Sequence, residues 1–171
     1  MVINNTTRIH NMQFEKSVLS VLMVNTGAYE SVASLLSERS FYAERHKTIY
    51  RVIKSLVEQG KPATEGFVDG LMRNDPETYK LMGGEEYLFE IYGDSFSDAH
   101  NLEYYVSELN RLADHRDVEE IAKKMIGVAN DVTQVDVFSS AEALMVANSN
   151  TTGGKKTSFE ASEALKALHE K

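Results

Sequence analysis

The feature that most constrains the fold is an apolar stripe that begins near residue 99 and continues for about thirty residues. Its members recur every three or four positions, which is the spacing of one face of an α-helix. A helix of that length is far longer than a typical globular helix, and a narrow apolar seam generally needs a second helix to cover it. The stripe consists of Leu102, Tyr105, Val106, Leu109, Leu112, Ala113, Ile121, Ala122, Met125 and Ala129.

A returning arm follows the long helix. Residues 131–136, which begin and end with aspartate, predict a reversal, after which Phe138, Ala141 and Met145 resume helical spacing. We therefore predict a helical hairpin over residues 99–147. Because the returning arm has only about a third of the length of the first, much of the seam stays exposed in a monomer. We expect a concentration-dependent oligomer built on hairpin contacts.

The preceding residues predict a globule of shorter helices over residues 12–98, after a flexible N-terminus at residues 1–11. The pattern favours helices near residues 12–25, 29–36, 43–59, 65–72 and 77–82, and one more that contains Tyr87 and Ile91. Asn11 is the expected N-cap of the first helix, and Gly60 ends the third. The expected inward side chains include Ala33 and Leu35 of the second helix and Phe67, Val68, Leu71 and Met72 of the fourth.

Beyond the hairpin, residues 148–156 are polar and glycine-containing, which is typical of a linker. Residues 157–171 predict one amphipathic linker helix, with Ala161, Leu165 and Leu168 on one side. A helix of this length is marginal in isolation, so we expect it to become ordered on another surface. The predicted fold class is all-α: a globule, a long hairpin, a flexible linker and a lone helix.

Composition and charge restrict the function. The 171 residues include no cysteine and carry a net charge of −8. No lysine or arginine occurs between Lys80 and Arg111, so this interval repels phosphate and favours a basic protein partner. We expect no direct binding of nucleic acid, no secretory signal, no membrane span and a cytoplasmic location.

The sequence contains no complete motif of the kinds that indicate catalysis. Residues 153–157 (Gly-Gly-Lys-Lys-Thr) lack the spacing of a phosphate-binding loop, because position 149 is Ser and a second lysine follows Lys155. The five histidines are scattered, and none forms the pattern of a catalytic zinc site. Paired glutamates such as Glu119 and Glu120 point in different directions on a helix. We therefore expect no catalytic, cofactor or metal site in this chain.

Several short motifs, in their order and spacing, resemble the N-terminal domain of DnaB-type replicative DNA helicases. They lie across residues 13–147. They are Glu15 to Met23 of the first helix, Ser40-Phe41-Tyr42 with His46 and Ile49-Tyr50, the stop Gly60-Lys61-Pro62, the segment Gly83-Gly84-Glu-Glu-Tyr87-Leu88, Asn101 with Tyr105, and Ile126 to Asn130. Departures such as Ser20, where the family has glycine, are typical of a divergent member from a phage or mobile element.

The resemblance implies a non-catalytic scaffold. In the family this domain forms a ring collar in which hairpins pair, the linker helix packs on a neighbouring motor, and the collar contacts primase and, in some systems, the helicase loader. ATP and magnesium belong to the motor domain, which would follow residue 171. The side chains that we expect at partner or oligomer interfaces are Tyr87, Leu102, Tyr105, Leu109, Leu112, Met125, Phe138, Ala161, Leu165 and Leu168.

Two functions are compatible with the sequence. The first is the helicase collar, which assembles the ring and recruits primase. The second is a stand-alone phage or mobile-element regulator that uses the same fold to bind a host helicase. An unrelated enzyme or nucleic-acid binder has no site in the sequence. A reading frame that continues past Lys171 into a motor favours the collar.

Overall fold

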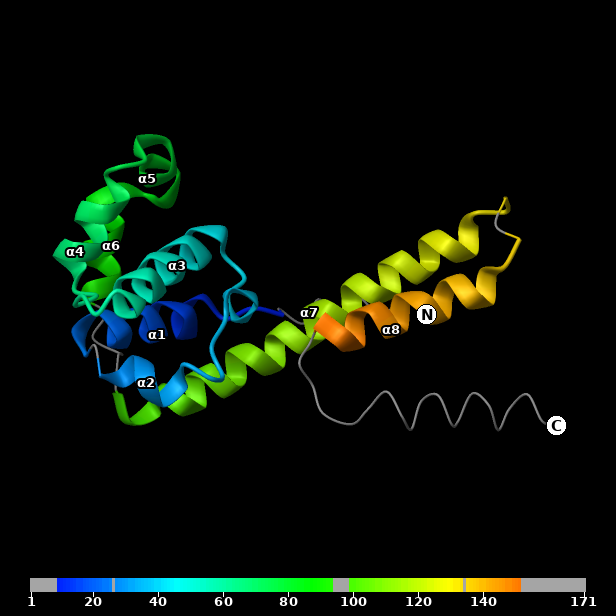
Figure 1. The fold of residues 1–171 in the computed structure, drawn as a ribbon, viewed down its shortest axis with the longest axis horizontal. Coiled ribbons are helices and arrows are strands. Elements are labelled where there is room, and N and C mark those ends of the chain that lie inside the picture. Colours follow the sequence, from blue (N-terminus) through cyan, green and yellow to red (C-terminus); the bar gives the residue numbers. More distant parts are fainter. Residues whose placement is uncertain (1–8, 26, 94–98, 134, 152–171) are drawn as a thin grey trace. The chain divides into compact units, whose positions relative to one another are not determined.

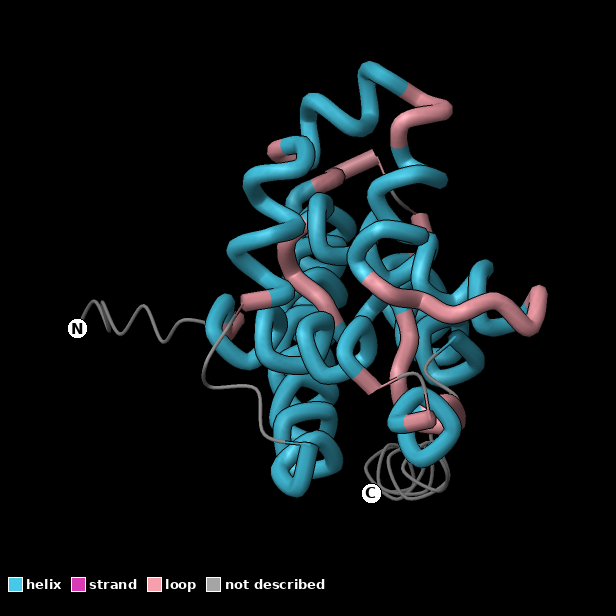
Figure 2. Tube along the Cα trace, turned by 90° about the vertical axis from the view of Figure 1, so that its left-hand side faces the viewer, coloured by secondary structure: helices cyan, strands magenta, loops and turns pink. Residues whose placement is uncertain are grey.

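The computed structural model describes residues 9–25, 27–93, 99–133 and 135–151, with side chains as far as residue 146. Within these ranges every regular element is a helix, as Figure 2 shows, so the all-α prediction is confirmed. The elements are α1 (Met12–Val24), α2 (Ala28–Val32), η1 (Glu38–Ser40), α3 (Glu44–Glu58), α4 (Glu65–Met72), α5 (Pro76–Met82), α6 (Gly84–Tyr92), η2 (Ala99–Asn101), α7 (Leu102–Asn130) and α8 (Val137–Thr151).

Helix α1 begins and packs as its sequence predicts. The Asn11 side chain accepts a hydrogen bond from the Phe14 amide at 3.1 Å, which satisfies one of the unpaired N–H groups at the start of the helix. Val18, Leu19 and Leu22 have no exposed surface. Helix α1 contacts α2, α3 and α6 and therefore forms the centre of the globule.

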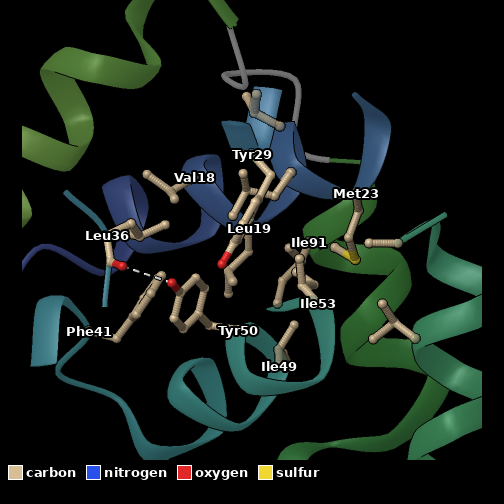
Figure 3. Packing of buried hydrophobic residues seen from close by; sticks show 14 of the residues in the cluster. Val18, Leu19, Met23, Tyr29, Leu36, Phe41, Ile49, Tyr50, Ile53 and Ile91 are labelled. Carbon is tan, nitrogen blue, oxygen red and sulfur yellow. Dashed lines mark hydrogen bonds between the residues drawn. The ribbon is translucent and has the colours of Figure 1, made fainter. Parts of the chain in front are cut away.

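The core of the globule combines side chains from α1, α3 and α6 with the segment around η1 (Figure 3). Leu19, Ile53 and Ile91 are fully buried there. The Tyr50 ring is also buried, and its hydroxyl donates a hydrogen bond to the Leu36 carbonyl at 2.8 Å. That bond satisfies a polar group that burial would otherwise leave unpaired.

The predicted inward-facing sides of α2 and α4 are partly wrong. Helix α2 ends at Val32, so Leu35 lies beyond it and is 55% exposed. On α4, Val68 and Met72 are buried as expected, but Phe67 is 49% exposed and Leu71 is 38% exposed. A helix of eight residues that contacts neighbours along one side can bury only one narrow stripe, and the pattern predicted a stripe that was too wide.

The chain divides into two compact units that meet inside α7, between His115 and Arg116. The sequence placed the boundary near residue 98 instead. The difference arises because the first turns of α7 complete the core of the first unit, where Leu102, Val106 and Leu109 are buried. Asn110 adds polar contacts: it accepts a hydrogen bond from Ser40 Oγ at 2.6 Å and donates one to the Leu35 carbonyl at 2.9 Å.

In the second unit, α8 runs back beside the C-terminal half of α7 (Figure 1), so the helical hairpin is present. Helix α8 extends to Thr151, four residues beyond the predicted end at residue 147. The first residues assigned to the linker are therefore helical. The remaining linker residues and the predicted linker helix at residues 157–171 lie outside the described residues, as do Ala161, Leu165 and Leu168.

Candidate interaction surface

A buried polar network joins three helices of the first unit. Glu15 on α1 has no exposed surface, and both of its carboxylate oxygens are hydrogen-bonded. One oxygen accepts from the Tyr42 amide at 2.9 Å, and the other accepts from the Ala43 amide at 3.3 Å. These amides lie at the start of α3, where a carboxylate is favoured by unpaired N–H groups and by the helix dipole.

The network continues through His46 to α6. The second carboxylate oxygen of Glu15 lies 2.6 Å from His46 Nδ1, and His46 Nε2 lies 2.6 Å from the Tyr87 hydroxyl. The exposed Arg45 guanidinium lies 3.9 Å from the centroid of the Tyr87 ring and shields it from solvent. Burial raises the pKa of the Tyr87 hydroxyl to about 12.

This arrangement of Glu, His and Tyr superficially resembles a proton relay, but its role is to hold the fold together. Glu15 and His46 are both fully buried, so no substrate can reach them. Each polar atom of the two side chains has a partner within the protein. The network therefore holds α1, α3 and α6 in a fixed relation. It also explains why the Tyr87 hydroxyl is present in a nearly buried position.

The turn of the hairpin is formed by two aspartates. The Asp131 carboxylate accepts hydrogen bonds from the amide and hydroxyl of Thr133, at 3.0 and 2.6 Å. Asp136 accepts from the Ser139 amide at 3.0 Å and so caps the start of α8. Both aspartates have pKa values below their usual range because these hydrogen bonds favour the charged form. The predicted reversal at residues 131–136 is confirmed on either side of residue 134.

The two arms of the hairpin cover each other only in part. Half-buried side chains on α7 recur at Ile121, Met125 and Val128, and those on α8 include Ala141 and Leu144. This spacing marks the stripes along which the arms face each other. Among the described side chains, none after Ala113 is buried. The hairpin is thus a long element with little interior of its own.

Large apolar side chains remain exposed along the hairpin. Val118 and Ile126 on α7 are 64% and 61% exposed, and Phe138 on α8 is 89% exposed. The polar side of α7 carries the ion pairs Glu119–Lys123 and Glu120–Lys124, at 2.6 and 2.7 Å. An exposed apolar surface beside a charged rim is typical of a protein–protein contact. It is the strongest candidate site in the described part of the chain.

The sequence anticipated only part of this surface. Phe138 is exposed and Met125 lies half-buried between the arms, whereas Tyr105 is partly buried against Phe14, at a ring distance of 4.9 Å. Four other predicted contact residues are buried in this chain: Tyr87, Leu102, Leu109 and Leu112. They serve its packing and offer a partner little surface. Val118 and Ile126 were not predicted, although they lie eight residues apart on one helix face, with Ala122 midway.

Three further predictions concerned metal binding, membrane-spanning helices and the acidic interval after Lys80. Among the described residues, no group of three His, Cys, Asp or Glu side chains could hold a metal ion. In that same part of the chain, no helix is both long and apolar enough to cross a bilayer. The acidic interval is partly neutralised from outside: Glu85 pairs with Arg73, and Glu90 pairs with Lys16.

Comparison with known proteins agrees with this architecture. A similar chain is the replicative DNA helicase DnaB of Pasteurella multocida, 26% identical over 73% of this chain and 25% of its own length. Another is the replicative DNA helicase DnaB of Treponema pallidum, 25% identical over 67% of this chain and 26% of its own length. The chain thus spans about a quarter of the length of these curated relatives. They give no support to the alternative of a stand-alone regulator.

A solved structure shows the same fold. The crystal structure of the N-terminal domain of DnaB helicase from Mycobacterium tuberculosis matches with a TM-score of 0.73 and 23% identity, over 80% of this chain and 97% of that one. The family model described as DnaB-like helicase N-terminal domain matches residues 7–111, which is well over half of the chain. The chain therefore belongs to the DnaB-like helicase N-terminal domain family.

Proposed function

We propose that this chain is the assembly domain of a hexameric replicative DNA helicase and that it associates with copies of itself through the hairpin. The family match supports a non-catalytic role in such a helicase. The single observation that carries the proposal is the exposed apolar surface of the second unit, around Ile126 and Phe138. A helical hairpin with so little interior gains stability when a partner covers it.

The free energy of burying apolar surface favours a partner whose own contact surface is apolar. Fully burying a large apolar side chain contributes roughly 1.5–3 kcal/mol, and association costs at least about 4 kcal/mol in lost freedom. Val118, Ile126 and Phe138 from each of two chains can exceed that cost if their surfaces fit. A second copy supplies such a surface without unpaired charges.

We further propose the remaining parts of the role by analogy with the family. The collar recruits primase and, in some systems, a helicase loader, and it acts in the cytoplasm. The domain itself uses no cofactor, because ATP and magnesium would act in a motor domain. It does not bind DNA directly, because its net charge of −8 opposes contact with phosphate.

Sedimentation of a paired set of variants tests the self-association. Ile126→Asp combined with Phe138→Asp places charge at two exposed positions, so we expect the helical circular dichroism to persist while the oligomer dissociates to monomer. The control is Leu81→Asp, because Leu81 is 85% exposed but lies on α5 of the first unit. A wild-type chain that stays monomeric at high concentration contradicts the proposal, and so does an Ile126/Phe138 variant that associates normally.

A further inference from the structure

Helix α4 of the first unit presents an uncharged face to solvent. Its inward side is formed by Val68 and Met72, which are buried in the globule. Successive residues of an α-helix are rotated by about 100°, so the positions opposite and beside this buried stripe point outward. This outward side, here called the α4 face, consists of Gly66, Phe67, Gly70 and Leu71. All four residues are exposed, and none carries a charge.

The described part of the chain gives no structural reason for the two glycines of the α4 face. Glycine in the middle of a helix weakens the helix relative to alanine, because its backbone loses more conformational freedom on folding. Gly66 and Gly70 are not among the glycines with positive φ. A Cβ added at either position would meet nothing within 4 Å. The missing side chains therefore leave open space at two positions one helical turn apart.

Such a face suits the close approach of a second helix. The distance between two packed helix axes depends on the side chains at the contact, and glycine allows a short separation. A helix that crosses α4 over the two glycines also covers Phe67 and Leu71, which are 49% and 38% exposed. Burial of these two side chains stabilises the contact. Helix α4 has eight residues and is about 12 Å long, so it accommodates about two turns of a partner helix.

The edge of the α4 face away from Phe67 is acidic. Glu65, Asp69 and Arg73 recur there at intervals of four residues. Arg73 pairs with Asp69 at 2.6 Å and with Glu85 of α6 at 2.8 Å, so it neutralises at most one of three carboxylates. The pKa of Glu65 is above its usual range, because burial disfavours its charge and because Asp69 and Glu85 repel it. A lysine or arginine of a partner is therefore favoured along this edge.

We propose that the α4 face binds an amphipathic helix of a different protein, with small and aliphatic side chains on its contact side and lysine or arginine along one edge. The small side chains lie over Gly66 and Gly70, and the aliphatic ones contact Phe67 and Leu71. The cations lie beside Glu65. A second copy of the chain fits less well, because its own α4 face has the same acidic edge. The site is separate from the hairpin and does not depend on self-association.

Fluorescence anisotropy with a labelled synthetic peptide tests the proposal on the full chain. The probe is a helical peptide of about 18 residues, with alanine and leucine on one side and lysine along one edge. Its matched control has glutamate in place of each lysine, and we expect the lysine peptide to bind several-fold more tightly.

Substitutions in the chain locate the binding site. Gly66→Leu combined with Gly70→Leu should weaken binding of the lysine peptide about tenfold, because the new side chains hold the peptide away from α4. The control is Gly127→Leu on α7, because a Cβ added at Gly127 also meets nothing within 4 Å. Gly66→Ala combined with Gly70→Ala should raise the melting temperature and still weaken binding, since alanine favours the helix but fills the open space. A purely structural role of the glycines does not give this combination.

Several results would overturn the proposal. One is a wild-type chain that does not bind the lysine peptide, and another is equal binding of the two peptides. A third is equal weakening by Gly127→Leu and by the paired leucine substitutions on α4. A lower melting temperature of the paired alanine variant would show that the glycines serve the fold. Sedimentation tests the remaining occupant: if the paired leucine substitutions dissociate an oligomer of the chain, a second copy covers the α4 face and the proposal is wrong.

Discussion

Glu15 Oε2 and His46 Nδ1 lie 2.6 Å apart, and both side chains are completely buried. Glu15 is on α1 and His46 is on α3, so the contact joins helices through residues that are 31 positions apart in sequence. Since the carboxylate also accepts hydrogen bonds from the amides that precede α3, the pair positions the start of that helix. Buried polar groups of this kind stabilise a fold only when every member has a partner.

Removal of either member of this pair should destabilise the first unit. His46→Ala leaves a buried carboxylate with one fewer donor and leaves the Tyr87 hydroxyl without its acceptor. We expect a loss of about 3 kcal/mol in the free energy of unfolding, measured by urea denaturation. His115→Ala is the control, because His115 is exposed. In a double-mutant cycle, Glu15→Gln and His46→Ala should be strongly non-additive, and simple additivity would refute the coupling.

Tyr87→Phe should cost less. The ring and its packing against Arg45 remain, but His46 Nε2 loses its partner, so we expect a loss of about 1–2 kcal/mol. Thermal melting measures this loss, and binding of primase to the same variant tests the partner role. Equal loss of stability and binding indicates that Tyr87 acts through packing. Loss of binding with an unchanged melting temperature indicates a direct contact instead.

The same tyrosine predicts a stability change at alkaline pH. Its pKa is raised from 10.0 to about 12 in the folded protein because burial disfavours the phenolate. The folded state therefore holds this proton more tightly than the unfolded state. Its stabilising contribution is complete below pH 10 and is lost as the pH rises from 10 to 12. Melting temperatures measured across this alkaline range should fall less steeply in Tyr87→Phe than in wild type. Identical slopes would contradict the assignment.

Two glycines with positive φ provide a matched test of backbone and packing. Gly83 has φ of 106°, and a Cβ added there would lie 2.8 Å from the Cβ of Tyr87. Gly60 has φ of 68°, but an added Cβ would meet nothing within 4 Å. Gly60→Ala should therefore cost only about 1 kcal/mol of conformational strain. Gly83→Ala should cost clearly more in the same denaturation assay. Equal losses in the free energy of unfolding would show that the close approach to Tyr87 adds no cost to Gly83→Ala.

The absence of motor chemistry is directly testable. The purified chain should not hydrolyse ATP, because its sequence contains no phosphate-binding loop. It should also show negligible binding to single- or double-stranded DNA at physiological salt. A coupled ATPase assay and fluorescence anisotropy with a labelled oligonucleotide measure these two activities. ATP turnover above background, or micromolar DNA binding that weakens steeply with salt, would contradict the proposed role.

Local patterns in the sequence were sufficient to predict most elements of the fold. The Asn11 cap, the stripe of Ile49, Tyr50 and Ile53, and the reversal after residue 130 all depend on neighbours a few positions away. Helix periodicity, capping and turn formation act over such short distances, so the sequence can report them. The order and spacing of the short motifs are likewise properties of the chain itself, and they were sufficient to indicate the family.

Tertiary structure alone decided which apolar stripes are covered and by what. The sequence pattern of α7 predicts one continuous apolar seam. In the structure the first half of that seam lies in the core of the globule, whereas Val118 and Ile126 farther along α7 are exposed. Glu15, His46 and Tyr87 occur in three separate motifs, and only the packing of α1, α3 and α6 brings them together. Burial depends on contacts between residues far apart in sequence, and helix periodicity contains no information about those distances.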